Sequence, residues 1–213
     1  MKSIKAGLLL NRLCVPILLA TLAVAQPATA APTAKAAAKR VDIATIHLFA
    51  ACVTDKYRQS VRRLLTLDYR TKAYDHALQT LTDSSRSCIP FAYGRMTSAG
   101  VLLAGAFAEK MLPKTLDGAP LAERVAYVPG KPPIAARDDG EYLGLCVVRT
   151  MPAQVTGLLA TKPASAEEKA AVAGMASGLG PCVRTGAQAK INVPGLRAIV
   201  ALAAYRLAAQ AGS

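Results

Sequence analysis

The sequence predicts an all-α protein whose main part consists of two tandem four-helix units, each closed by its own disulfide. Three observations support this prediction. Apolar residues recur at helical spacing through most of the chain after residue 40. The cysteines of that part fall into two pairs with the same internal spacing. A segment rich in proline separates the two pairs, as expected for a connector between units.

Residues 1–30 have the layout of a signal peptide, with cations before an apolar run and small residues after it. The cations are Lys2, Lys5 and Arg12. The apolar run, residues 15–25, is too short to be a membrane span, which takes about 20 residues. We predict cleavage after Ala30, which removes Cys14 together with the signal peptide. The sequence therefore indicates a periplasmic or secreted protein without a transmembrane span after processing.

The two cysteine pairs reveal an internal repeat. Cys52 and Cys88 are 36 residues apart, and so are Cys146 and Cys182. Shifting the chain by 94 residues, the difference between positions 52 and 146, also places Leu64-Leu65 over Leu158-Leu159. After the second cysteine of each pair, a slip of one residue aligns further positions: Gly100 with Gly195, Ala106 with Ala201, and Leu112 with Leu207. We interpret these coincidences as the duplication of one unit.

Each copy is predicted to contain four helices. The first extends over about 41–55, and its counterpart starts near Gly140. The second carries the leucine pair, and in the second copy it begins near Pro152, because proline suits a first helical turn. The third follows Thr71 in one copy and Ser165 in the other, where Glu168 completes a capping box. The fourth helix starts after the cap residues Thr97 and Asn192 and should be the central packing element of its unit.

These boundaries divide the chain into consecutive parts. The segment between the repeats contains five prolines and is consistent with a linker that includes either a short helix or an extended piece over 121–128. The predicted parts are a signal peptide (1–30), a basic flexible arm (31–40), helical repeat 1 (41–112), a Pro-rich linker (113–139), helical repeat 2 (140–208) and a C-terminal tail (209–213).

Four cysteines in an exported chain are expected to pair, with free thiols as the alternative. Of three connectivities, we favour Cys52 with Cys88 and Cys146 with Cys182, because duplication of a closed unit preserves its bridge. A redox role would call for two thiols two residues apart, and a zinc site for closely spaced ligands. The sequence contains neither pattern, so we predict structural disulfides, no metal site and no cofactor.

The chain is basic, with a formal charge of +13, of which the signal peptide holds three cations. The densest basic stretch surrounds the second predicted helix and forms a candidate anion-facing patch: Lys56, Arg58, Arg62, Arg63 and Arg70. A solvated helix face is the alternative interpretation. The absence of Trp and the scarcity of aromatic residues argue against a dedicated single-strand nucleic-acid binder. We therefore expect an envelope polyanion or a protein as the partner, without sequence-specific nucleic-acid binding.

The two histidines are the remaining candidates for chemistry. His47 lies on the first predicted helix, and its counterpart in the second copy is Glu141. His76 lies beside Asp75 and upstream of three serines: Ser84, Ser85 and Ser87. A hydrolase would need such an imidazole next to a nucleophile and an acid. No nucleophile elbow or phosphate-binding loop accompanies either histidine, so we assign no catalytic residue.

Several short motifs resemble a group of exported bacterial proteins built on a duplicated, cysteine-containing helical unit. In the second copy these are Cys146-Val-Val-Arg, Leu158-Leu, Ser165-Ala-Glu-Glu, Cys182, Leu196-Arg and Ala203-Ala-Tyr; in the first copy they are Leu67-Asp-Tyr-Arg and Ala104-Gly-Ala-Phe-Ala-Glu. The resemblance covers both repeats and implies no activity. A looser likeness, through Cys88-Ile-Pro, is to small disulfide-bonded helical immunity proteins, whose cysteine pattern otherwise differs.

Together these features predict a non-enzymatic periplasmic binding or envelope-associated module, whose groove lies between the two units. The alternative is a small periplasmic hydrolase or lyase that uses His76 or His47. The two are distinguished by whether either imidazole lines a pocket together with an acid or a nucleophile.

Overall fold

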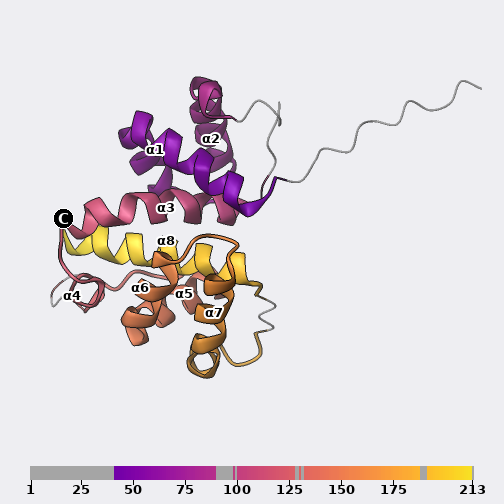
Figure 1. Cartoon of the computed structure of the whole chain (residues 1–213). Helices are drawn as coiled ribbons and strands as arrows, with labels where there is room; N and C mark the ends of the chain where they lie inside the picture. The colour runs from indigo at the N-terminus through magenta and orange to yellow at the C-terminus, as the bar shows by residue number, and fades with distance from the viewer. Residues whose placement is uncertain are drawn as a thin grey trace, which may run out of the picture. The chain divides into compact units, whose positions relative to one another are not determined.

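The computed structural model describes residues 41–89, 98, 100–127, 130, 132–187 and 191–212. Every regular element in these residues is helical (Figure 1). The elements are α1 (Ile43–Thr66), α2 (Lys72–Ser84), η1 (Arg86–Cys88), α3 (Gly100–Leu116), α4 (Leu121–Val125), α5 (Asp139–Thr150), α6 (Pro152–Ala160), α7 (Ala166–Leu179), η3 (Gly180–Cys182) and α8 (Val193–Ala211). The predicted all-α fold is confirmed. The predicted signal peptide, the basic arm and the cap residue Thr97 lie outside the described residues.

Helix α1 contains the two helices that the sequence predicts at the start of the first copy. Asp42 caps it, because its side chain accepts hydrogen bonds from the backbone N–H and the hydroxyl of Thr45, both at 2.8 Å. The helix bends at Tyr57, whose backbone is non-helical at φ −129° and ψ 40°. The hydroxyl of Tyr57 donates a hydrogen bond to the carbonyl of Ser84 at 2.7 Å, which fixes the bend against α2.

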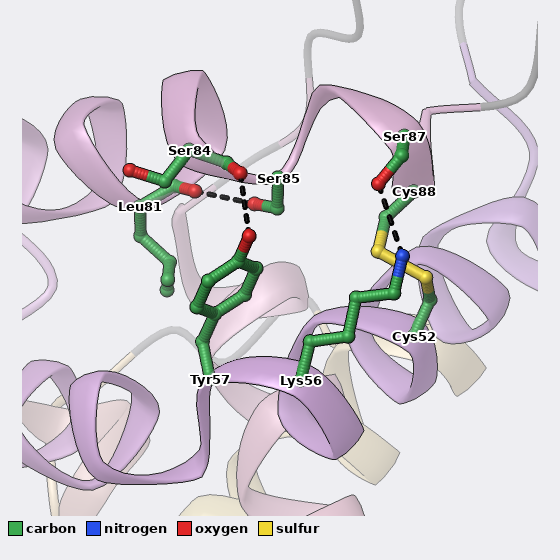
Figure 2. Close-up of a disulfide and its surroundings, with 8 residues drawn as sticks. All are labelled: Cys52, Lys56, Tyr57, Leu81, Ser84, Ser85, Ser87 and Cys88. Atoms are coloured by element: carbon green, nitrogen blue, oxygen red, sulfur yellow. Dashed lines mark hydrogen bonds between the residues drawn. A yellow bond between two sulfur atoms is a disulfide. The ribbon is translucent and has the colours of Figure 1, made fainter.

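The first disulfide joins α1 to the 3₁₀ turn η1 that follows α2 (Figure 2). Cys52 and Cys88 are bonded, and their Cα atoms lie 5.6 Å apart. Beside them, Lys56 Nζ donates a hydrogen bond to Ser87 Oγ at 3.0 Å. The bridge therefore holds the end of the α2 segment against the middle of α1.

Helices α5 and α6 meet at Met151, where the backbone is non-helical at φ −133° and ψ 48° and the axes bend by 104°. Asp138 caps α5 by accepting a hydrogen bond from the N–H of Glu141 at 2.7 Å. Pro152 occupies the start of α6, as predicted. Among the described helices, no single one is long and apolar enough to cross a membrane.

Helix α7 begins with the predicted cap, but the return bond of the capping box has a different donor. Ser165 Oγ accepts from the N–H of Glu168 at 3.1 Å, as predicted. The carboxylate of Glu168 accepts from the N–H of Ala164 at 2.7 Å rather than from that of Ser165. Ala164 has a positive φ of 63°, and this left-handed backbone places its N–H within reach of Glu168. At the other end of the segment, η3 supplies Cys182, which is bonded to Cys146 with Cα atoms 5.5 Å apart.

Helices α3 and α8 lie side by side and form the centre of the fold (Figure 1). α8 also contacts α4, α5, α6 and α7, whereas α1 packs on α3. The crossing is close at Gly105, where an added Cβ would lie 2.4 Å from the Cα of Ala198. Asn192 caps α8 as predicted, accepting from the N–H of Gly195 at 2.8 Å. The fourth predicted helices thus occupy the core together.

The predicted linker is only partly irregular. Helix α3 continues through Pro113 to Leu116, and α4 follows as a short helix, which is one of the two forms expected for this segment. Leu121 and Val125 of α4 are buried, and α4 packs against α8. The docked part of the linker therefore belongs to the core.

Candidate functional site

The residues of the predicted anion-facing patch occupy different surroundings. Arg58 and Arg62 of α1 line one large cavity, whereas Arg63 lines a second cavity between α1 and α2. Lys56 is hydrogen-bonded to Ser87. Arg70 is paired with carboxylates, as described below. Arg58 and Arg62 therefore share a cavity, and Arg63 lies in another.

The cavity that contains Arg58 and Arg62 has a volume of about 800 Å³. It is bounded by α1, α3, the segment before α5, and the last part of α8. Two further arginines line it: Arg137, which precedes α5, and Arg206 of α8. We call this cavity the basic groove. Its volume lies within the range of about 300 to 1,000 Å³ that small-molecule sites occupy.

Neither Arg137 nor Arg206 belongs to the patch that the sequence predicts. Arg137 falls in the predicted linker, and Arg206 is an isolated cation in an apolar helix. In the sequence, a cation within an apolar helix indicates a special role, because burying a charge costs free energy unless a counter-charge lies nearby. That counter-charge is Glu141, which the sequence shows only as the counterpart of His47.

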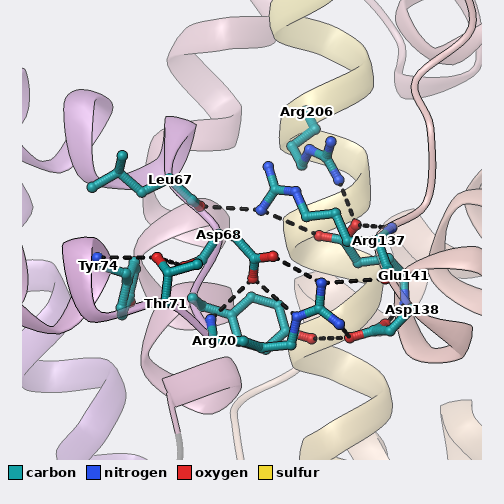
Figure 3. Close-up of polar contacts among 10 residues, drawn as sticks. Leu67, Asp68, Arg70, Thr71, Tyr74, Arg137, Asp138, Glu141 and Arg206 are labelled. Atoms are coloured by element: carbon teal, nitrogen blue, oxygen red, sulfur yellow. Dashed lines mark hydrogen bonds and ion pairs between the residues drawn. The ribbon is translucent and has the colours of Figure 1, made fainter.

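Glu141 holds the two arginines at one side of the basic groove (Figure 3). Its side chain is 6 % exposed, and one carboxylate oxygen lies 2.9 Å from Nη1 of Arg206. The same oxygen accepts from the backbone N–H of Arg137 at 2.8 Å, and the other lies 3.5 Å from Nη1 of Arg137. Arg137 also donates to the carbonyl of Leu67 at 3.1 Å, which ties the segment before α5 to the end of α1. Burial lowers the pKa of Arg206 from its usual value, and Glu141 opposes this shift.

Next to this pair, Arg70 is neutralised by two aspartates (Figure 3). Its guanidinium lies 2.8 Å from Asp68 and 3.0 Å from Asp138. The hydrogen bonds from Arg70 lower the pKa of Asp68 to about 2. Tyr69 donates a further hydrogen bond to Asp138 at 3.2 Å. Arg70 therefore joins the two halves of the chain and has no charge to spare for a ligand.

Arg58 and Arg62 differ from these residues in having no counter-ion among the residues that the structure describes. The Nε of Arg58 is buried and has no hydrogen-bond partner. A buried donor without a partner costs about 1 to 3 kcal/mol. Arg62 is exposed at the rim of the basic groove. Burial raises the pKa of the nearby Tyr205 hydroxyl, and the positive charge of Arg62 partly opposes this shift. Uncompensated positive charge is thus concentrated on the side of the basic groove that α1 forms.

The floor of the basic groove is apolar. It is formed by buried side chains of α1, α3 and α8: Leu65, Met111 and Ala208. Partly buried Ile134 and Ala209 extend this surface. The basic groove therefore offers a bound molecule both a cationic edge and a hydrophobic contact.

A second charged centre lies on α8, at Arg197, which is 1 % exposed. Its guanidinium makes two hydrogen bonds to Glu109 of α3, at 2.8 and 2.7 Å, and one to the fully buried Glu168 of α7 at 3.3 Å. It also donates to the carbonyls at the end of α6: Leu158, Leu159 and Thr161, at 3.0, 3.2 and 2.9 Å. Carbonyls in the last turn of a helix lack the usual i+4 donor, so Arg197 caps the end of α6 and joins four helices.

The two histidines have different surroundings. His47 is partly buried, and its Nδ1 lies 3.9 Å from a carboxylate oxygen of Glu109. Burial lowers the pKa of His47, whereas Glu109 opposes this shift. Glu109 is itself held by Arg197 through two hydrogen bonds, which ties its orientation to the fold. His76 is exposed on α2. Neither imidazole lines the basic groove or the cavity beside Arg63.

The hydroxyls of the three serines near His76 have partners other than the imidazole, and Figure 2 shows those of Ser85 and Ser87. Ser84 Oγ donates to the carbonyl of Thr80 at 2.9 Å, and Ser85 Oγ donates to the carbonyl of Leu81. Ser87 accepts from Lys56. None of these contacts places an imidazole next to a hydroxyl. Within the described ranges, no group of three or more His, Cys, Asp or Glu residues has the arrangement of a metal site.

Comparison of the chain with protein-family models, with curated proteins and with solved structures found no match. Functional conclusions therefore rest on the geometry of the basic groove. The decisive contrast is between Arg137 and Arg206, which share the carboxylate of Glu141, and Arg58 and Arg62, which have no counter-ion in the described part of the chain.

Proposed function

We propose that this chain is an exported, non-enzymatic binding protein whose basic groove takes an anionic ligand at the cell envelope. One observation carries the proposal: Arg58 and Arg62 share a cavity of ligand size, lack a counter-ion in the described part of the chain, and include a buried Nε without a partner. An anionic group at this edge of the basic groove would supply the missing acceptor. Charge-assisted hydrogen bonds from arginine to phosphate or carboxylate are among the stronger polar contacts in proteins.

The proposed compartment is the periplasm or the exterior of a bacterial cell. The two disulfides indicate an oxidising environment, because cytosolic thiols are kept reduced. We infer that residues 1–30 are the signal peptide that directs export, although they lie outside the described residues. An exported binding protein would meet anionic envelope components in this compartment.

We also propose that the fold consists of two tandem four-helix units related by duplication. The sequence offset of 94 residues relates the non-helical Tyr57, at φ −129° and ψ 40°, to the non-helical Met151, at φ −133° and ψ 48°. The same offset relates the caps Thr71 and Ser165, the turns η1 and η3, and the two disulfides. In this description the basic groove is formed by both units, since α1 and α3 belong to one and α8 to the other.

The alternative is a small hydrolase or lyase that uses His47, and one observation favours it. His47 lies near a carboxylate, that of Glu109, as a general base requires. However, Glu109 is engaged by Arg197, and the described residues place no nucleophile beside His47. Binding in the basic groove therefore remains the better-supported function.

Titration of the oxidised protein with inorganic pyrophosphate tests the proposed function. We expect one molecule to bind per chain, with an affinity that falls steeply as the NaCl concentration rises. The double variant Arg58→Gln/Arg62→Gln should bind at least about tenfold more weakly, because it removes charged donors. Arg63→Gln is the control for Arg62→Gln alone, which should also weaken binding: each removes one positive charge from the same helix, but Arg63 lines a different cavity. Salt-independent binding, or an equal loss in Arg63→Gln, would refute the proposal.

A further inference from the structure

The basic groove has two chemically distinct parts. Arg62 is exposed at its rim, and the Nε of Arg58 lies nearby without a partner. Its accessible apolar surface comes from the partly buried Ile134 and Ala209, because Leu65, Met111 and Ala208 are between 0 % and 3 % exposed. A ligand that filled the basic groove would therefore place an anionic group against the rim and apolar atoms against the floor.

This division discriminates among anions. A small inorganic anion would pair with the arginines but leave the apolar surface of Ile134 and Ala209 in contact with water. A nucleic acid would need a continuous cationic track and stacking surfaces along its path. Here Arg70 is neutralised by Asp68 and Asp138, so the positive charge does not extend past the end of α1. A neutral lipid would cover the floor but leave Arg58 without an acceptor.

We infer that the basic groove binds a single-chain amphiphile with an anionic head group, such as a fatty acid or an alkyl phosphate. This inference rests on the proposed function and specifies its ligand class. The head group would accept hydrogen bonds from Arg58 and Arg62, and the hydroxyl of Tyr205 lies near the same charge. The alkyl chain would lie along the partly buried Ile134 and Ala209.

The basic groove carries more positive charge than Glu141 compensates, which favours an anionic head group. Glu141 compensates part of the charge of Arg137 and Arg206, and it fixes their positions. Arg58 and Arg62 have no counter-ion among the described residues, so the basic groove keeps an excess of positive charge that would attract a phosphate monoester or a carboxylate. The cavity of about 800 Å³ has room for a head group together with part of one alkyl chain.

Calorimetric titration with dodecyl phosphate, kept below its micelle-forming concentration, tests this inference on the oxidised protein. We expect one molecule to bind per chain, at least about a hundredfold more tightly than inorganic phosphate, because burying several methylene groups adds hydrophobic free energy. Dodecyl maltoside, which has the same alkyl chain and a neutral head, should bind at least about tenfold more weakly than dodecyl phosphate, because it offers no charged acceptor to the arginines.

Two variants separate the contributions of head and chain. Arg58→Gln/Arg62→Gln should lose the preference for dodecyl phosphate over dodecyl maltoside, whereas Arg63→Gln should retain it. Ala209→Leu should fill part of the floor and weaken dodecyl phosphate binding, but leave pyrophosphate binding unchanged. Circular dichroism and thermal melting of each variant show whether the fold is intact.

Three outcomes would overturn the inference. If dodecyl phosphate binds no more tightly than inorganic phosphate, the ligand is not an amphiphile, although anion binding and the proposed function stand. If dodecyl maltoside binds as tightly as dodecyl phosphate, the head group is not recognised as an anion. If neither dodecyl phosphate nor pyrophosphate binds, the inference and the proposed function both fail.

Discussion

Arg197 illustrates how a single buried side chain can stabilise several helices at once. It bonds Glu109 and Glu168 and also caps α6. Burying a guanidinium costs free energy of several kcal/mol, and the surrounding carboxylates and carbonyls must offset that cost. Its contribution is therefore cooperative: loss of the cation would leave Glu168 as a buried charge without its partner.

We predict that Arg197→Met lowers the free energy of unfolding by about 3 to 5 kcal/mol, because it strands the carboxylate of Glu168. Urea unfolding monitored by circular dichroism measures this change. Arg86→Met is the matched control, since Arg86 is 80 % exposed and lies 3.5 Å from Asp83. The control should change stability by less than about 1 kcal/mol. Equal effects of the two substitutions would show that the Arg197 contacts are not coupled to folding.

The Asp68–Arg70 pair gives a prediction about pH. The pKa of Asp68 lies at about 2, below the ordinary value of 3.8, so the folded state favours the carboxylate. The pair therefore stabilises the fold above pH 4, and this contribution is lost as the pH falls from 4 to 2. In Arg70→Gln, the pKa of Asp68 should return toward its ordinary value, as measured by NMR titration of the side-chain carboxyl carbon.

The stability difference between the wild type and Arg70→Gln should follow the same pH range. It should be small, below about 1 kcal/mol, because both side chains are partly exposed to solvent. The difference should shrink as Asp68 is protonated. An unchanged pKa of Asp68 in Arg70→Gln would contradict the claim that the hydrogen bonds from Arg70 lower this pKa.

At the residue level, the sequence predicts local contacts better than distant ones. The caps Ser165 and Asn192 are recognisable because their partners lie three residues away. The buried role of Arg197 is not recognisable, because its partner Glu109 is on another helix. A cation in an apolar helix signals that a counter-charge exists but does not identify it.

At the level of the elements, the crossing of α3 and α8 depends on small residues. A Cβ at position 105 would lie 2.5 Å from the Cβ of Ala198 and 2.7 Å from its carbonyl oxygen. Since backbone atoms surround this site, the contact cannot be relieved by a side-chain rotation. Glycine at position 105 therefore sets how closely the two central helices approach.

We predict that Gly105→Ala is destabilising by about 1 to 3 kcal/mol, because overpacking exceeds the gain in helix propensity. Gly174→Ala provides the opposite case. An added Cβ at Gly174, inside α7, meets no atom within 4 Å, so alanine should stabilise the helix by up to about 1 kcal/mol. Thermal melting of both variants shows whether each substitution lowers or raises the melting temperature. Stabilisation by Gly105→Ala would refute the close crossing.

The disulfides connect elements that are distant in sequence, and each should stabilise the fold to a similar extent. Each encloses a sequence separation of 36 residues, for which loop-closure entropy gives about 4 kcal/mol. We predict a loss of this order for Cys52→Ala/Cys88→Ala and for Cys146→Ala/Cys182→Ala, measured by urea unfolding. A negligible loss in either double variant would show that the unfolded state is not restricted by that bridge.

Several element boundaries follow from the sequence, and the bends at Tyr57 and Met151 lie where one predicted helix ends and the next begins. Pro152 marks the start of α6, and the repeated spacing predicts both disulfides. Tyr57 carries no helix-breaking signal, and the bend there becomes understandable only through its hydrogen bond to Ser84. A tertiary contact decides the conformation at such a position.

For the whole molecule, the basic groove could not be derived from the sequence. Its arginines come from three separate parts of the chain, at positions 58, 62, 137 and 206. The predicted patch includes Arg58 and Arg62 because they are close in sequence. It also includes Arg63 and Arg70, which have other surroundings in the structure. Only the packing of α1, α3 and α8 brings the four groove arginines together.

NMR detection of the arginine Nε–Hε groups during titration with dodecyl phosphate tests the central claim most directly. We predict that the signals of Arg58 and Arg62 shift in a saturable manner, whereas those of Arg63 and Arg86 do not. The signal of Arg58 should also become protected from exchange with water, because its Nε gains an acceptor. Shifts confined to Arg63 and Arg86, or saturation with no change at Arg58, would contradict the assignment of the basic groove as the binding site.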